Sequence, residues 1–181
     1  MKIKILELNN FKSFKGKTTI SFKSGLTLIT GLNGTGKSNI IDGINFALGK
    51  YEAKTEYLIH ESETDASVKI VLIDGNGNLI SIFKTIDING KKSLCINRKP
   101  ANDNDIPYYE DFDFLLLDSD AYNQLDSKKM KDLIAKLKEK SNRQQIILVN
   151  TGNDLTDYAN QIIAVNQKIK NQSEIKETQF I

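Results

Sequence analysis

The 181-residue sequence has little of several residues that build common kinds of site: one cysteine, one histidine, two prolines and no tryptophan. The single cysteine, Cys95, excludes an internal disulfide and any cysteine cluster around a metal. We expect it to be a small buried side chain in a strand. The single histidine, His60, cannot by itself build a metal site or a catalytic triad, so we interpret it as a surface or packing residue.

Charge of one sign and long apolar runs are also scarce. The 25 Lys and Arg residues against 23 Asp and Glu give a net charge of +2. No global basic field therefore indicates nucleic-acid binding, although local patches are compatible with these numbers. No apolar run approaches membrane-spanning length, and the N-terminus enters a strand pattern without signal-peptide architecture. We expect a soluble, cytoplasmic protein that forms one compact domain.

The most informative segment that is present runs from Gly31 to Ser38 and reads G-L-N-G-T-G-K-S. It is a complete phosphate-binding loop of the G-x-x-x-x-G-K-[ST] (Walker A) type. Its glycines let backbone N–H groups converge on phosphate oxygens. Lys37 places a charge between the β- and γ-phosphates, and Ser38 offers a hydroxyl to Mg²⁺. An apolar strand precedes the loop and a helix follows it, so the context also predicts nucleotide binding.

Apolar periodicity and Gly/Asn turns predict the other elements. Strands are expected at residues 2–8, 18–22, 26–30, 66–73, 79–88, 93–97, 112–118, 145–149 and 161–165. Helices are expected at residues 39–48, 127–140 and 154–158. This order predicts an antiparallel layer in the middle and a parallel layer around the loop, with helices as crossovers. From Asn166 onward the composition is polar, and we expect a loosely held tail.

A second part of the nucleotide site is predicted at Phe114–Asp118, four apolar residues that end in aspartate. In P-loop NTPases such a strand lies beside the loop strand, and its Asp reaches the Mg²⁺ shell. The candidate metal residues are therefore Ser38 and Asp118. Many ATPases of this layout carry a glutamate at the next position, where this chain has Ser119, and a serine is no general base at neutral pH without an activating partner. Asp120 is the remaining acidic candidate if the chain turns after Asp118.

Phe11-Lys-Ser-Phe14 and Gly31 to Gly49 (G-L-N-G-T-G-K-S-N-I-I-D-G-I-N-F-A-L-G) resemble a known family, as do Tyr57-Leu-Ile-His60 and Gln145-Ile-Ile-Leu-Val149. The family is the ATPase head of SMC (structural maintenance of chromosomes) proteins and their RecF/RecN-type relatives, a branch of the ABC ATPases. The resemblance implies an α/β fold, a P-loop NTPase of ABC/SMC-head type. It implies a mixed sheet with an N-terminal antiparallel β layer and a parallel α/β core.

The resemblance also implies ATP and Mg²⁺ as cofactors. It brings Lys12 and Ser13 to the nucleotide and Asn39 to the Mg²⁺ end of the site. The expected nucleotide-binding residues are Lys12, Ser13, Asn33, Gly34, Thr35, Gly36, Lys37, Ser38 and Asn39. For Lys12 the residues alone leave two interpretations open, since a lysine beside the loop meets a phosphate or stays a solvated surface group.

The sequence departs from the family in the features that serve catalysis and contact between two heads, and not in those that bind ATP within one head. We expect one domain over residues 1–166, with lobes at 1–100 and 111–166, and a flexible tail over 167–181. A connector over 101–110 replaces the family's long coiled coil and hinge. The L-S-G-G-Q signature and the glutamine loop are missing, Ser119 occupies the position of the catalytic Glu, and Asn150-Thr151-Gly152 replaces the switch histidine.

Three interpretations remain open, and none involves a membrane. The leading one is a slow or non-hydrolysing ATP-dependent accessory module of chromosome or DNA maintenance, chromosome-associated, whose partner is a full-length SMC-like protein or a second copy. The second is a slow ATPase that binds DNA through its lysines. These are Lys12, Lys15, Lys17 and Lys23, then Lys50 and Lys54, and Lys128, Lys129, Lys131, Lys136, Lys138 and Lys140 on the late helix. The third is a structural relic whose loop binds no nucleotide.

Overall fold

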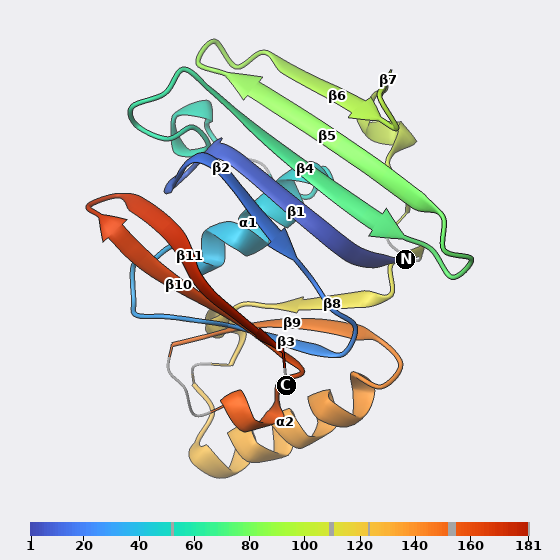
Figure 1. The fold of residues 1–181 in the computed structure, drawn as a ribbon, viewed down its shortest axis with the longest axis vertical. Helices are drawn as coiled ribbons and strands as arrows, with labels where there is room; N and C mark the ends of the chain where they lie inside the picture. Colours follow the sequence, from blue (N-terminus) through green and yellow to red (C-terminus); the bar gives the residue numbers. More distant parts are fainter. Residues whose placement is uncertain (52, 109–110, 123, 152–154, 181) are drawn as a thin grey trace.

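Two β-sheets enclose a central helix in the computed structural model, which describes residues 1–51, 53–108, 111–122, 124–151 and 155–180 (Figure 1). The first sheet is antiparallel, in the order β2-β1-β4-β5-β6-β7. Its strands are β1 (Lys2–Phe11), β2 (Phe14–Ser21), β4 (Asp65–Ile73), β5 (Leu79–Asp87), β6 (Lys92–Ile96) and β7 (Lys99–Pro100). Three predicted segments include residues outside this description: the connector (109–110), the late short helix (154) and the tail (181). Gly152 also lies outside it.

The second sheet has the order β11-β10-β3-β9-β8, and its four strands from β10 to β8 run parallel. Its strands are β3 (Leu26–Thr30), β8 (Phe114–Leu117), β9 (Gln145–Asn150), β10 (Gln161–Ile169) and β11 (Gln172–Phe180). The strand that feeds the phosphate-binding loop, β3, lies in the middle with all five residues buried. This arrangement confirms the predicted fold class, an antiparallel N-terminal layer with a parallel α/β core.

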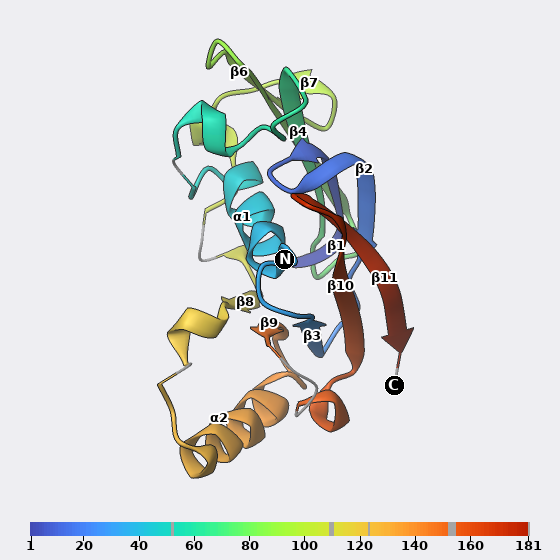
Figure 2. The same cartoon turned by 90° about the vertical axis from the view of Figure 1, so that its left-hand side faces the viewer.

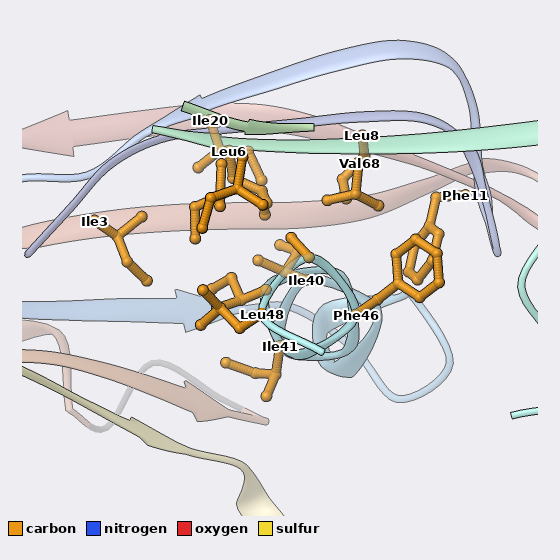
Figure 3. Close-up of a cluster of buried hydrophobic side chains, with 14 of the residues drawn as sticks. Ile3, Leu6, Leu8, Phe11, Ile20, Ile40, Ile41, Phe46, Leu48 and Val68 are labelled. Atoms are coloured by element: carbon orange, nitrogen blue, oxygen red, sulfur yellow. The ribbon is translucent and has the colours of Figure 1, made fainter. Parts of the chain in front are cut away.

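Helix α1 (Lys37–Ala47) lies between the two sheets and carries the main core. Its apolar side chains face strands of the first sheet on one side, where Leu6, Leu8 and Val68 are wholly buried (Figure 3). At the edge of this cluster the Phe11 and Phe46 rings meet at a centroid distance of 5.5 Å. A helix packed on both faces has little freedom to move, so the loop that precedes α1 sits on a rigid support.

Helix α2 (Ser127–Lys140) covers the opposite face of the second sheet (Figures 1 and 2). Asp126 caps its N-terminus, because the carboxylate accepts a hydrogen bond of 2.9 Å from the backbone N–H of Lys129. Ile134 and Leu137 are buried against the sheet, and most of the helix's lysines face solvent. Short 3₁₀ turns complete the described structure at Thr55–Tyr57, Asp103–Asp105, Ser119–Ala121 and Thr156–Tyr158.

Two buried glutamines join the sheets where no strand ladder does. Gln145 accepts from Ile3 N–H at 2.8 Å and donates to the carbonyl oxygens of Ile3 and Lys23, both at 2.9 Å. Gln161 accepts from Lys23 N–H at 2.9 Å and donates to the Ser21 carbonyl at 2.7 Å. Each amide therefore satisfies backbone groups that the gap between the sheets would otherwise leave unpaired.

The structure differs from the sequence-based expectation in the bounds of several elements and in the added strand β7, and it differs further at the C-terminus and at Cys95. β10 continues to Ile169 and pairs with β11, so a β-hairpin stands where a loosely held tail was expected. The polar composition of β11 gave no strand signal, because β11 is an edge strand. Among its first four residues, Ser173 is buried and Ile175 packs against the core, in the alternation of a strand. Cys95 lies in a strand as expected, but it is only half-buried.

Candidate nucleotide-binding site

The phosphate-binding loop spans the gap between the end of β3 and the start of α1. Gly34 and Gly36 have φ values of 79° and 95°, a left-handed conformation that favours glycine. Inside the loop, the Thr35 hydroxyl donates to the Leu32 carbonyl at 2.9 Å. Because α1 begins at Lys37, the loop directs the first N–H groups of the helix toward the site, which is a general design for holding phosphate.

Lys37 is folded back onto its own loop. Its ammonium donates to the carbonyl oxygens of Gly31 at 2.9 Å and Leu32 at 2.7 Å, and only 6% of the residue is exposed. Burial lowers the pKa of this ammonium below its usual value, and the nearby carboxylate of Asp118 opposes that shift. A partly desolvated cation held by neutral carbonyls gains from exchanging them for an anionic phosphate.

Lys12 is not a solvated surface lysine, so that one of its two interpretations is wrong. Its ammonium donates to Asp42 Oδ2 at 2.6 Å and to the Tyr51 hydroxyl at 2.8 Å, and it lies 4.8 Å from the centre of the Tyr51 ring. Burial works to lower the pKa of Lys12, but the hydrogen bonds to Asp42 and Tyr51 prevail and raise it. Neither partner was recognised from the sequence, because neither belongs to the loop motif.

Ser13 and Asn39, two of the expected site residues, contact each other. The Asn39 amide donates to the Ser13 hydroxyl at 2.6 Å, which ties the segment after β1 to the first turn of α1. Gly36, the residue before the helix, lies against the same hydroxyl, since a Cβ there would come within 2.6 Å of Ser13 Oγ. The N-terminal segment and the loop therefore form one continuous surface.

The acidic side of the site is Asp118, whose charge acts on Lys37. Its Oδ1 accepts from the backbone N–H of Ser119 at 2.7 Å and from the Ser119 hydroxyl at 3.1 Å. The chain then turns through a 3₁₀ helix, and such a turn was the condition for Asp120 to approach the loop. The Asp120 side chain is nevertheless exposed. No hydrogen bond or ion pair from Asp120 is present among the described residues.

The segment after β9 also reaches the loop. The Thr151 hydroxyl donates to the Asn33 side-chain oxygen at 3.2 Å, although 118 residues separate the two in sequence. The position that holds a switch histidine in the resembled family thus carries a hydroxyl–amide pair. Sequence reasoning noted the loss of the histidine but had no signal for this pairing, which depends on the parallel register of β3 and β9.

A cavity of about 410 Å³ opens beside the loop, next to Gly34, Lys12 and Ser13. Its other wall holds Tyr57, Ile59, His60, Glu61 and Asn171. His60 is buried, and its Nδ1 lies 3.2 Å from the Ser62 backbone nitrogen and 3.0 Å from the Ser62 hydroxyl oxygen. Its Nε2 is buried and has no partner among the described residues.

The donor set fits magnesium better than any transition metal. Ser38 is exposed at the start of α1, and the Asp118 carboxylate has a second oxygen that Ser119 does not use. In the described part of the chain no three Asp, Glu, His or Cys side chains gather into a metal cluster. Mg²⁺ in phosphate sites needs none, because it takes one or two protein oxygens and completes its shell with phosphate and water.

Comparison with known proteins decides the family. Residues 2–112 match the family described as "RecF/RecN/SMC N terminal domain". The chain belongs to this family. A chromosome partition protein Smc from Halobacteriovorax marinus is 36% identical over an alignment of 132 residues, which covers 59% of this chain and 11% of that protein. The Smc of Thermoplasma acidophilum is 39% identical over 97 residues, 54% of this chain and 8% of that protein. The chain thus spans about a tenth of these SMC relatives.

Solved SMC heads share the whole fold. An Smc head crystallised with the C-terminal winged-helix domain of ScpA superposes with a TM-score of 0.87 at 18% identity, over 100% of this chain and 98% of that one. The SMC head domain from Thermotoga maritima gives 0.81 at 18% identity, over 99% and 100%. None of the described helices of this SMC-type head combines the length and apolar character needed to cross a membrane.

Proposed function

We propose that this chain is an ATP- and Mg²⁺-binding SMC-type head module that hydrolyses ATP slowly or not at all. ATP acts as a switch ligand in it, and the module serves as an accessory or regulatory component of chromosome or DNA maintenance. Its partner in the ATP state is a full-length SMC-like head or a second copy of this chain. Gly34, Thr35, Gly36, Lys37 and Ser38 hold the phosphates in this proposal, with Asn33 and Asn39 at the two ends.

The observation that carries this proposal is the contrast between the two halves of the site. The loop is complete. Two of its carbonyl oxygens hold the Lys37 ammonium, and the charge of Asp118 acts on it. Ser119, the residue after Asp118, donates its hydroxyl to the Asp118 carboxylate and provides no general base for a water molecule. Binding groups are therefore present where the group that would activate water is missing.

The cavity beside the loop supports the nucleoside half of the proposal. It adjoins Gly34, so a nucleotide whose phosphates sit in the loop extends into it. Tyr57, on the wall of this cavity, offers an exposed ring to a base. Lys12, fixed by Asp42, lies at the junction between phosphate and nucleoside.

A single-turnover experiment tests the proposal: excess protein, trace labelled ATP, Mg²⁺, and Lys37→Ala as the control. We expect ATP to be retained intact by the wild type and not by the variant. Lys37-dependent formation of ADP within minutes would instead favour the ATPase alternative, with Asp120→Asn as the next variant. No retention by either protein would leave the structural-relic interpretation.

One observation favours DNA binding as a second function. On α2 and the turn after it, Lys136, Lys140 and Arg143 line a hollow of about 520 Å³ together with Glu139 and Asn142, so its cations outnumber its one carboxylate. The N-terminal lysines are worse candidates, because Lys12, Lys15 and Lys17 are paired with Asp42, Glu63 and Glu7.

Charge reversal of Lys136 and Lys140 tests this surface. If it binds DNA phosphates, affinity for a duplex falls and the slope of affinity against salt becomes shallower by about one unit for each phosphate that is no longer neutralised. The same reversal at Lys15 and Lys17 is the matched comparison. Unchanged DNA affinity in the Lys136/Lys140 variant would remove the hollow from consideration.

A further inference from the structure

The C-terminal hairpin of β10 and β11 contacts the phosphate-binding loop through a residue outside the loop motif. Ser173, the second residue of β11, is 5% exposed. Its backbone N–H donates to the Ser13 carbonyl at 2.7 Å. Its hydroxyl oxygen lies 2.7 Å from Ser13 Oγ and 2.6 Å from the Thr35 carbonyl oxygen. One side chain thus bridges the N-terminal segment and the loop.

The bond to Thr35 fixes the direction of a loop N–H. A carbonyl and the N–H of the next residue share one rigid peptide plane and point in opposite directions. When Ser173 holds the Thr35 carbonyl, the Gly36 N–H is therefore directed away from the hairpin. Gly36 is the residue on which the hairpin lies, since a Cβ at this position would overlap the Ser173 hydroxyl.

The hydrogen bond between the Ser173 and Ser13 hydroxyls also links the hairpin to the segment after β1. The Ser13 hydroxyl also accepts from Asn39 in the first turn of α1. Ser173 has one hydroxyl hydrogen for its two acceptors, Ser13 and Thr35, so the three groups share one network and do not move independently.

We infer that Ser173 is a positioning residue of the nucleotide site, and that the β10–β11 hairpin sets the geometry of the phosphate-binding loop. The inference rests on the proposed nucleotide binding and deepens it. Because the coupling of two equilibria is reciprocal, a nucleotide that fixes the loop also holds the hairpin in place.

Titration of ATP into the wild type, Ser173→Ala and Gln172→Ala tests the inference. Gln172 is the matched control, since it is the adjacent residue of β11. Loss of the bridging hydroxyl is expected to weaken ATP binding about tenfold, and Gln172→Ala to change it less than twofold. Ser173→Thr keeps the hydroxyl and is expected to restore most of the affinity. In a double-mutant cycle with Ser13→Ala, the two losses are expected not to add, because the residues act through each other.

Hydrogen exchange supplies a readout that needs no variant. The Ser173 amide is expected to exchange at least severalfold more slowly with ATP than without it, whereas amides at the distant β4–β5 turn stay unchanged. Wild-type affinity retained in Ser173→Ala would overturn the inference, as would equal losses in Gln172→Ala or an ATP-independent Ser173 amide. Failure of the wild type itself to bind ATP would sink the proposed function first, so the two failures are distinguishable.

Discussion

At the scale of single residues, Ser119 separates binding from turnover. The loop, Lys37 and Asp118 are assembled as in a working P-loop site, while the Ser119 hydroxyl is turned toward Asp118 at 3.1 Å. A serine in that bond neither orients nor deprotonates a water. In the proposed function, Ser119 is thus one reason why the site holds ATP and leaves it intact.

The substitution Ser119→Glu is expected to raise single-turnover ATP hydrolysis by about tenfold or more. A positioned general base contributes about a hundredfold to ten-thousandfold, and an unoptimised position recovers part of that. Ser119→Gln has nearly the same shape without the basic oxygen, and it is expected to stay at the wild-type rate. Equal rates for the Glu and Gln variants would show that the missing base is not what limits turnover.

Gln145 acts at the same scale on stability. Its amide makes two buried hydrogen bonds to backbone groups of Ile3 and a partly buried one to the Lys23 carbonyl. Gln145→Leu is expected to lower the free energy of unfolding by about 2–4 kcal/mol, because those groups are left buried and unpaired.

Urea denaturation measures this loss, and the chain offers a matched control next to it. Gln144 has a buried side-chain oxygen without a partner among the described residues. Gln144→Leu removes that unpaired atom and is expected to leave stability unchanged or slightly higher. A loss of similar size in both variants would refute the role given to the Gln145 amide.

At the scale of elements, α1 is held so closely that even a methyl group is too large at one position. Gly43 is buried, and a Cβ there would lie 2.6 Å from Leu8 Cδ2 in β1. Gly43→Ala is expected to destabilise the fold by about 1–2 kcal/mol in thermal or urea unfolding, since overpacking outweighs the gain in helix propensity. Gly75→Ala is the control, because nothing lies within 4 Å of its Cβ, and a stabilised Gly43→Ala protein would contradict the packing argument.

Local patterns predicted most elements, because each rests on its own periodicity or turn chemistry. The loop and α1 follow from the spacing of Gly31 to Ser38, and the β4–β5 hairpin follows from its Asp-Gly-Asn-Gly-Asn turn, where Asp74 accepts from the N–H groups of Asn76 and Asn78. The hairpin β10–β11 escaped prediction because its order comes from distant partners. Ser173 bonds to Ser13 and Thr35, more than 130 residues away.

The candidate site divides in the same way. Its loop residues are contiguous in sequence and were identified, as was the strand that ends in Asp118. The residues that hold Lys12 and Asn33 in place, Asp42, Tyr51 and Thr151, come from separate segments and carry no motif. Hydrogen bonds between side chains of separate segments depend on how the folded chain brings those segments together.

At the scale of the whole molecule, the nucleotide is expected to stabilise the fold. A ligand at one hundred times its Kd adds about 2.7 kcal/mol. For a domain of this size we expect a rise in Tm of about 5–11 °C with Mg²⁺-ATP, measured by differential scanning fluorimetry. Lys37→Ala is expected to abolish the rise, and an equal rise in that variant would place the bound nucleotide elsewhere.

The position of β3 in the second sheet has a consequence for the time course of folding. β3 pairs with β9 in the register Leu26↔Ile146 and with β10 in the register Gln161↔Thr27, so its neighbours lie at least 120 residues further along the chain. Such non-local pairing forms slowly, because the chain loses the entropy of closing a long loop before the stabilising contacts can form. The phosphate-binding loop is therefore synthesised well before the strands that complete its sheet, and it takes its final shape only when they pair. On the proposed function, binding of ATP begins only after β10 has been made.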